Sequence, residues 1–473
     1  MQQLKAKLLV SLLILISLGV INLIYLYNKV DFTTDKGGHI PSLIEFIPGQ
    51  RIKNDSSEEV EKRFRFIVKQ SASLKRLINY QVCKRHWKNM MDSTLIAIIR
   101  SRSIFVYSAY LDEYNEAEDY FYTIRVFIYQ RKNVTEKVYG KFFSDDQRLL
   151  QLAMPIEIKR LNGVSDDSWD GFIAAFRIER EKLDNIRPCV IGIWTKNYAE
   201  IVLPIRRTSF IKKIVNNLIC VMPNARTEVI TPAKLTEFLA VTRAIGVDKI
   251  IAYVGDESPW YLKQILASKD KIQEIDLIRW SPPKGELKVE DEIFLKNECL
   301  YRGMAEAKFI SFLTYDQIIT PSYNFGSLTE AFDQFFQMHP KSQIACFPRV
   351  YYPKSLISNQ DTKARNVFIK YETRKRCKYL DPDQETCIVR SDGIEYITEK
   401  GPIPRLKANH EVKVTREGLA KYAISRFYQD PNKGSLCNLV YERNFEVDNS
   451  IERFINRKVI RRLQRKIEML KKY

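Results

Sequence analysis

KFISFLTYDQII, residues 308–319, is an apolar run that ends in Thr-Tyr-Asp-Gln and then turns apolar again. The run from Phe309 to Leu313 is typical of a strand that is buried on both faces. Asp316 therefore comes at the end of a buried strand, where a carboxylate without a partner costs free energy. We interpret Asp316 as a functional residue. An exposed acid in an ordinary turn before Pro321 is the alternative.

Strands and helices alternate before this stretch. NLICVMP, DKIIAYVG and EIDLIRW predict strands, whereas AKLTEFLAVTRAIG, PWYLKQILAS and FLKNECLYRGMAEA predict helices. The buried face of the first helix is predicted to carry Leu235, Phe238, Leu239, Thr242 and Ile245. Gly246 is a natural end for that helix. The alternation predicts an α/β domain with a mostly parallel sheet, and ligands of such sheets bind outside the carboxyl ends of the strands.

A region of different texture precedes this domain. The segments STLIAII, SIFVYSAYL, YFYTIRVFIY, DGFIAAFRI and CVIGIW are short, rich in β-branched and aromatic residues, and separated by polar residues. They predict a small β-rich domain.

The N-terminus predicts a membrane anchor. Leu8–Tyr27 carries no charge over a length that spans about 30 Å of hydrocarbon as a helix. Lys5 and Lys7 precede it, which favours a cytosolic N-terminus, and Tyr25 and Tyr27 lie where an aromatic belt would be. A cleaved signal peptide is the alternative, although its apolar region is usually shorter and ends in a small-residue site that is absent here.

The complete predicted organisation has six parts. They are a cytosolic tail at 1–7, an anchor at 8–27, a stem at 28–78, the β-rich domain at 79–215, the α/β domain at 216–440 and a basic amphipathic helix at 441–473.

Cysteines and glycosylation sequons agree with a lumenal location for the bulk of the chain. Sequons occur at Asn54 and Asn133, and the eight cysteines are an even number. There is no C-x-x-C spacing and the chain has only four His, which argues against a zinc site and favours disulfides or buried thiols. Cys377 and Cys387 could close a turn, but the pairing does not follow from sequence.

The formal net charge of +19 does not define the partner, because Lys and Arg are spread along the chain. The C-terminal helix carries one apolar stripe, Phe454, Ile455, Val459, Ile460, Leu463, Ile467 and Leu470, and is otherwise basic. It is expected to dock on its own domain or to pair with a second copy in a homodimer. Contact with an anionic membrane or an acidic glycan is the alternative, and a lumenal domain excludes nucleic acid.

Several ordered segments resemble glycosyltransferase family 92. They are FVYSAYLD, CVMPNARTE with LTEFLAVTRAIGVDKIIAYV, LKNECLYRG with AKFISFLTYDQII, CKYLDPDQ and LKANHEV, and they span roughly 100 to 415. The resemblance implies a GT-A fold and a Golgi enzyme, anchored as a single-pass type II membrane protein. It also implies an inverting transfer of a hexose from a UDP-sugar to a glycan acceptor, with galactose as the first candidate for the hexose. No P-loop or G-x-G-x-x-G competes with this interpretation.

The motif that holds a metal in the family is altered here. Where the family has Asp-x-Asp-Glu, this chain has Thr314, Tyr315, Asp316 and Gln317. The resemblance implies a divalent metal, with Mn²⁺ as the first candidate. Asp316 and His410, which comes later in the chain, would hold it against the diphosphate. Thr314 could add a weak oxygen ligand. His410 as an ordinary loop histidine is the alternative, and a second late His is not evident in VRSDGIEYI.

Four further residues are candidates for the site. Arg226 and Asp256 follow predicted strands and could bind the donor, or they could be a solvated arginine and a turn residue. Asp392 and Glu395 are candidates for the general base that an inverting transferase needs. A second function stays open: a family member that has lost metal-dependent chemistry and acts as a glycan-binding or partner protein.

Overall fold

The computed structural model of the protein contains two sheets of nine strands each among its described residues. The described residues are 96–97, 104–113, 121–131, 137–144, 149–161, 169–180, 187–195, 198–208, 215–222, 231–255, 258–267, 275–280, 289–352, 375–377, 381–398, 400–405, 413–415, 423–427, 445–447, 454 and 465. All of them belong to one compact unit, Ile52–Tyr473. The predicted tail, anchor and stem, and both sequons, lie outside them. None of the helices within the described ranges has the length and apolarity that a bilayer crossing requires.

The first sheet contains only strands, as the sequence predicts for this region. Its members are β1 (Ile96–Ala97), β2 (Ile104–Asp112), β3 (Phe121–Arg131), β4 (Val138–Phe143), β5 (Leu149–Ala153), β6 (Glu157–Arg160), β7 (Trp169–Glu179), β8 (Val190–Thr195) and β9 (Tyr198–Arg207). The order is β5-β4-β8-β9-β2-β3-β7-β6, with β1 added beside β2. All pairs are antiparallel except β2 with β9. Branched and aromatic side chains from one face form a core of their own.

The second sheet combines strands with helices. The strands are β10 (Val215–Val221), β11 (Lys249–Val254), β12 (Asp276–Arg279), β13 (Ala307–Leu313), β14 (Gln317–Pro321), β15 (Ser342–Tyr351), β17 (Asp381–Arg390), β20 (Lys413–Thr415) and β21 (Ala423–Phe427). The helices are α5 (Pro232–Ala244), α6 (Trp260–Ala267), α7 (Val289–Met304) and α8 (Leu328–Met338). Each predicted strand and helix of the alternating region is present, and Gly246, with φ +97°, follows Ile245, the C-cap residue of α5.

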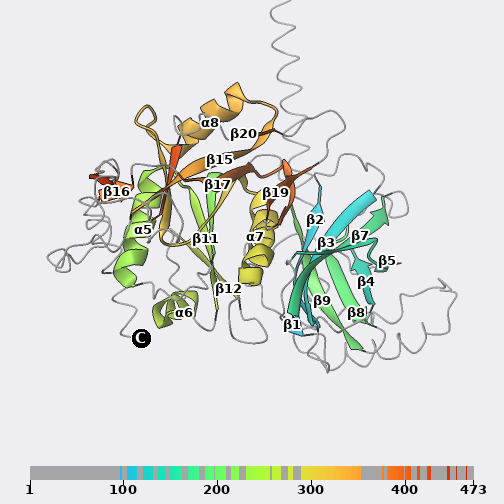
Figure 1. Ribbon diagram of the computed structural model, residues 1–473. Coiled ribbons are helices and arrows are strands. Elements are labelled where there is room, and N and C mark those ends of the chain that lie inside the picture. Colours follow the sequence, from blue (N-terminus) through green and yellow to red (C-terminus); the bar gives the residue numbers. More distant parts are fainter. Residues whose placement is uncertain are drawn as a thin grey trace, which may run out of the picture. The chain divides into compact units, whose positions relative to one another are not determined.

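The second sheet is mixed, whereas the sequence predicts a mostly parallel one. Its order is β12-β11-β10-β13-β17-β15-β21-β14, with β20 beside β15. The first four strands are parallel, but β17 runs antiparallel to both β13 and β15. Helices connect the parallel strands, because a parallel pair needs a crossover. Among the described elements that follow α8, the strands added to the sheet run in both directions (Figure 1).

Two short ribbons complete the described strands. β16 (Lys375–Cys377) pairs with β22 (Phe445–Val447), and β18 (Ile394–Thr398) pairs with β19 (Gly401–Pro404). β22 lies within 441–473, the segment that the sequence predicts as a basic helix, and most of that segment lies outside the described residues. Farther along the same segment, Phe454 is buried in the core under the second sheet.

Helix α7 lies between the two sheets (Figure 1). It contacts β10 and β13 on one side and β2 and β7 on the other. Its aromatic residues Phe294 and Tyr301 pack edge-on against Phe127 of β3, with ring centroids 5.6 Å apart in both pairs. One continuous apolar core therefore joins the β-rich part to the α/β part.

Among the described residues of the α/β part, two disulfides are present. Cys220 of β10 is bonded to Cys299 of α7, and Cys346 of β15 is bonded to Cys387, its direct partner on β17. The predicted closure of a turn by Cys377 and Cys387 is wrong, because the strand register places Cys387 opposite Cys346 instead. Cys189 in the β-rich part is disulfide-bonded as well.

Candidate functional site

The α/β sheet has a topological switch point between β10 and β13. The next strand along the chain, β11, lies on one side of β10 in the sheet, and β13 lies on its other side. The two strands are parallel and in register to their ends, with Val221 opposite Leu313, and the Met222 N–H donates to the Leu313 carbonyl oxygen at 2.8 Å. In open α/β sheets, ligands bind in the crevice outside the carboxyl ends of the strands at such a point. The candidate site is therefore beyond the carboxyl ends of β10 and β13.

A tight turn follows β13 at this edge. The Gln317 N–H donates to the Thr314 carbonyl oxygen at 3.1 Å, and the Thr314 N–H donates to the Gln317 side-chain oxygen at 3.2 Å. The Thr314 hydroxyl donates to the Asp316 carboxylate. Asp316 is only 5% exposed. Gln317 thus closes the turn, while the Thr314 hydroxyl holds Asp316 in place.

The first turn of α5 brings a lysine to this acid. Thr231 caps the helix by accepting the Lys234 N–H at 3.1 Å. Lys234 is 8% exposed, and its ammonium interacts electrostatically with the Asp316 carboxylate. Burial lowers the pKa of Lys234, and the Asp316 carboxylate opposes that shift. Two buried residues of opposite charge, Lys234 and Asp316, are therefore found in this part of the fold, and the sequence did not point to the lysine.

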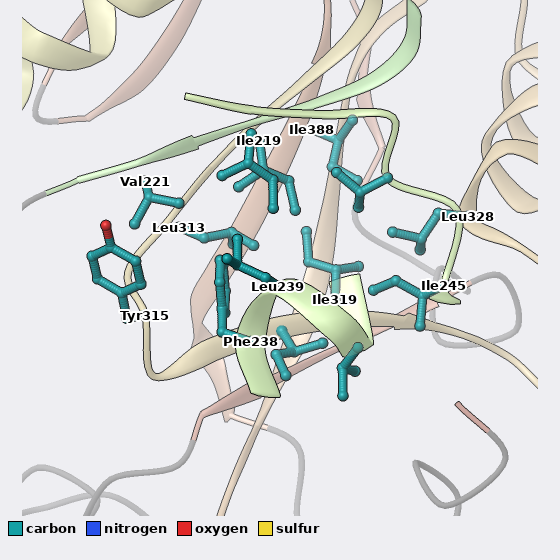
Figure 2. Packing of buried hydrophobic residues seen from close by; sticks show 14 of the residues in the cluster. Ile219, Val221, Phe238, Leu239, Ile245, Leu313, Tyr315, Ile319, Leu328 and Ile388 are labelled. Atoms are coloured by element: carbon teal, nitrogen blue, oxygen red, sulfur yellow. The ribbon is translucent and has the colours of Figure 1, made fainter. Parts of the chain in front are cut away.

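Tyr315 fixes the turn against α5. Its ring lies 5.4 Å from the ring of Phe238 at an interplanar angle of 67°, and Figure 2 shows its hydroxyl at the end of the ring farther from Phe238, on the side of Val221. The ring is 4% exposed, and burial raises the pKa of the hydroxyl. That hydroxyl has no hydrogen-bond partner among the described residues. A buried polar atom without a partner is uncommon in a folded protein.

The described residues do not fit a divalent metal well. Mn²⁺ prefers several oxygen ligands of net negative charge. Within the described ranges, no group of three His, Cys, Asp or Glu side chains could hold a metal ion. Asp316 is the acid of the altered motif, it accepts a hydroxyl, and it interacts with an ammonium. The other predicted ligand, His410, lies outside the described residues, so its role stays a prediction.

Asp392 and Glu395 follow β17 in the chain and lie near the amino end of β13, whereas Asp316 lies beyond its carboxyl end. Phe309, near the start of β13, pairs with Arg390 at the end of β17, and Asp392 follows two residues later. At about 3.3 Å per residue, the seven residues of β13 separate this edge from Asp316 by roughly 20 Å. The structure does not bring either candidate base together with Asp316.

Glu395 has partners of its own at that edge. Its carboxylate accepts from Arg125 of β3 at 3.3 Å, and Lys159 of β6 lies at 3.9 Å from it. These are contacts of the acid with the β-rich sheet. The two remaining candidates, Arg226 and Asp256, lie outside the described residues. Asp256 immediately follows Gly255, whose N–H donates to the Ser258 hydroxyl at 2.9 Å.

These observations define a mixed α/β protein with a buried acid beyond the carboxyl ends of the strands at the switch point of its second sheet. A family model described as glycosyltransferase family 92 matches residues 217–469, which is more than half of the chain. The chain belongs to glycosyltransferase family 92, as its sequence motifs predict.

Two further comparisons add little. No curated protein matches the chain. Among solved structures, the chain is similar to HddC from Yersinia pseudotuberculosis, with 12% identity over 46% of this chain and 91% of that one. The TM-score of 0.22 is too low for this likeness to carry an argument.

Proposed function

We propose that the chain transfers a hexose from a UDP-sugar to a glycan acceptor, with UDP-galactose as the first donor to test. Family membership supports glycosyl transfer. The observation that supports the proposed position of the donor site is the burial of Asp316 just after β13, whose end lies beside the end of β10. A sugar nucleotide is the kind of ligand that the switch point of an α/β sheet accommodates.

The proposed chemistry is a single displacement with inversion. An acceptor hydroxyl oxygen attacks the anomeric carbon, the bond between that carbon and the UDP oxygen breaks, and UDP leaves with the electron pair. The acceptor proton goes to a general base. Because Asp392 and Glu395 lie roughly 20 Å from Asp316 by the length of β13, we assign the base to neither. In this scheme Asp316 and Lys234 orient the donor diphosphate at the edge of β10 and β13.

The proposed setting is the Golgi lumen, with the chain anchored by residues 8–27 as a type II membrane protein. The support is the uncharged length of this segment and the family's cellular role. Fluorescence microscopy of the tagged full chain, with protease protection of its C-terminus, tests this setting. A C-terminus digested in intact vesicles would exclude the lumenal orientation.

The test of function is transfer of labelled galactose by the full-length chain in detergent. UDP-galactose is offered with a panel of glycans, with and without Mn²⁺. Asp316→Asn is expected to lower kcat/KM by about 10²–10³-fold, the cost of removing an electrostatic contact at a reacting centre. Asp333→Asn is the matched control, since Asp333 lies on α8 in an exposed ion pair with Lys308. Equal activity of the two variants would exclude a role for Asp316.

A catalytically impaired, glycan-binding family member is the second candidate. Two observations favour it: Thr314 hydrogen-bonds to Asp316, and the Gln317 side chain is engaged in the turn. In this case the chain would bind glycans on an array, and transfer would be absent with every donor and acceptor offered.

A further inference from the structure

We propose that the disulfide between Cys346 and Cys387 is a reducible lock on the turn that carries Asp316, and that a dithiol breaks it before it breaks the disulfide between Cys220 and Cys299. The inference adds a redox modification site to the α/β part. Its effect on glycosyl transfer rests on the proposed function, whereas the order of reduction and the state of the turn are independent of that function.

The first argument is the position of this disulfide in the second sheet. β17 lies between β13 and β15, β15 pairs with β21, and β21 pairs with β14. β13 is also joined directly to β14 by the turn at 314–316. The five strands therefore form a closed circuit of four pairings and one turn. Cys346–Cys387 supplies a covalent bond in this circuit, at the pairing of β15 with β17.

The circuit holds the turn from both of its ends. Gln317, the first residue of β14, lies opposite Phe427 of β21, and Phe427 lies opposite Tyr351 at the end of β15. At the other end of the turn, β13 is paired with β17. A movement of β15 relative to β17 would therefore displace β14 relative to β13 and disturb the turn between them. The disulfide opposes that movement because it bonds β15 to β17.

The second argument is the unequal burial of the two disulfides. Cys220 and Cys299 are both 0% exposed. Cys346 is 2% exposed, but its partner Cys387 is only partly buried. An external thiolate must reach a sulfur atom to break a disulfide, so the rate of reduction depends on access. Cys387 gives a reductant the access that both sulfurs of the other disulfide lack.

The third argument is that the two strands remain paired without the disulfide. Cys346 and Cys387 are direct partners on antiparallel strands, and the pairing continues on both sides of them over residues 344–348 of β15. This disulfide also has a sequence separation of 41, against 79 for Cys220–Cys299, so its loss releases less chain entropy in the unfolded state. The reduced chain is therefore a folded state in which the bond can form again.

The proposed reaction is thiol–disulfide exchange with a dithiol. A thiolate of the reductant attacks Cys387 Sγ, the sulfur–sulfur bond breaks, and Cys346 leaves as a thiolate that takes up a proton. The second thiolate of the reductant attacks the reductant sulfur now bonded to Cys387, and Cys387 leaves as a thiolate that is protonated in turn. Two electrons pass from the dithiol to the cysteine pair, and the dithiol becomes a cyclic disulfide. The reverse reaction restores the lock.

The first test measures the order of reduction in the full-length chain in detergent. Dithiothreitol is added, samples are quenched with an alkylating reagent at successive times, and peptide mapping follows each cysteine. Cys346 and Cys387 are expected to be alkylated at least about tenfold faster than Cys220 and Cys299, because exchange rates depend on access to sulfur. Equal rates, or faster reduction of Cys220 and Cys299, would overturn the inference.

The second test measures the turn by hydrogen exchange and mass spectrometry, in the oxidised, reduced and reoxidised chain. The Thr314 and Gln317 amides, which are hydrogen-bonded within the turn, are expected to exchange faster after reduction and to recover after reoxidation. The amides of α6, which lies outside the circuit, are the control and are expected to keep their rates. Unchanged exchange in the turn, or an equal increase in α6, would contradict the lock.

The third test uses a variant and the activity. Replacing Cys346 and Cys387 together by Ala is expected to reproduce the exchange of the reduced chain and to abolish its response to dithiothreitol. The unaltered chain already supplies both redox states, so a variant that fails to fold leaves the first two tests decisive. Transfer of labelled galactose is expected to fall by about tenfold or more on reduction, because small displacements at a reacting centre are costly.

The outcomes separate this inference from the proposed function. Transfer that is the same in the oxidised and the reduced chain would overturn the influence of the lock on the reaction. Transfer that is absent in both states, while exchange in the turn still depends on the disulfide, would overturn the proposed function and leave the lock in place.

Discussion

Asp112 shows how single charged residues hold the two parts of this molecule together. The side chain lies at the end of β2 with 0% exposure. Its carboxylate accepts from Arg125 Nε at 2.8 Å and from Arg405 at 2.9 and 3.0 Å. Burial alone would raise the pKa of Asp112, but the two guanidinium groups together hold it below its ordinary value. Arg405 also donates to the Ile394 carbonyl oxygen at 3.0 Å. One acid thus joins β2, β3 and the β18–β19 ribbon.

Asp112→Asn is expected to destabilise the protein by about 3–5 kcal/mol, because it leaves the buried Arg405 without its counter-charge and leaves Arg125 with the more distant Glu395 carboxylate at 3.3 Å. Chemical denaturation monitored by intrinsic fluorescence measures the change. Asp333→Asn removes the acid of an exposed ion pair and is expected to change stability by about 1 kcal/mol or less. Equal stabilities of the two variants would contradict the role of the Asp112 network.

At the same scale, the sequence predicts the importance of Asp316 but not the partners of most charged residues. A lone acid after an apolar run is visible in the chain itself. The engagement of Glu395 by Arg125 depends on a contact across 270 positions, which no local pattern encodes. Lys234 was missed for a related reason, because a lysine in the first turn of a helix normally faces water and its burial depends on tertiary packing.

Among the elements, α5 is the one whose ends position the site. Thr231 caps its beginning, and its last residues are followed by Gly246 at φ +97°. The Gly246 N–H donates to the Arg243 carbonyl oxygen at 3.1 Å, and Ile245 accepts the Leu328 N–H at 2.8 Å. The helix is therefore fixed at its far end to the start of α8.

Gly246→Ala is expected to destabilise the protein by about 1–2 kcal/mol, because a left-handed residue with a Cβ is strained. The added Cβ would also lie 3.0 Å from the Ser327 Cβ. Gly326→Ala is the control, since its Cβ would meet nothing closer than the Glu330 carboxylate at 3.5 Å. Thermal unfolding measures both, and a Gly326→Ala variant that loses as much stability as Gly246→Ala would refute the argument.

Sequence periodicity predicts the strands and helices of this chain better than it predicts which strands lie side by side in the sheet. The alternation of strand and helix from β10 to β13 follows directly from hydrophobic pattern. The direction of β17 does not follow from that pattern, because a buried strand has the same apolar sequence whether its neighbour is parallel or antiparallel. The position of β14 could not be predicted either: it follows β13 after a tight turn, yet it pairs with β21 across the sheet.

For the whole molecule, the disulfides add covalent links to the α/β part. Cys220–Cys299 closes a loop with a sequence separation of 79 and ties β10 to α7, and Cys346–Cys387 has a separation of 41. Replacing Cys220 and Cys299 together by Ala is expected to cost about 3–4 kcal/mol of stability. Denaturant titration measures this loss, and non-reducing peptide mapping tests the pairing. A peptide that links Cys377 to Cys387 would contradict the strand register.

Buried acids also set the stability of the whole molecule in acid. Glu298 of α7 accepts Tyr110 at 2.6 Å and contacts Tyr253 and Arg302. Burial alone would raise its pKa, but Arg302 and the other partners together hold the Glu298 pKa below its ordinary value, as Arg405 and Arg125 do for Asp112. The unfolded chain then binds more protons than the folded one in this range, so stability is present above the usual carboxyl pKa of about 4 and falls as pH drops through the folded values.

We expect the free energy of unfolding to decrease steadily as pH falls below about 4.5, the upper end of ordinary carboxyl titration. Equilibrium denaturation from pH 7 to pH 2 measures the slope. The Asp112→Asn and Glu298→Gln variants start from lower stability, and each is expected to show a shallower slope, because one acid with a depressed pKa no longer contributes proton uptake. The Asp333→Asn control should keep the slope of the unaltered chain, since its acid is exposed. A slope that stays unchanged in both buried-acid variants would show that other carboxylates govern acid unfolding, and that the two networks joining the sheets are not its origin.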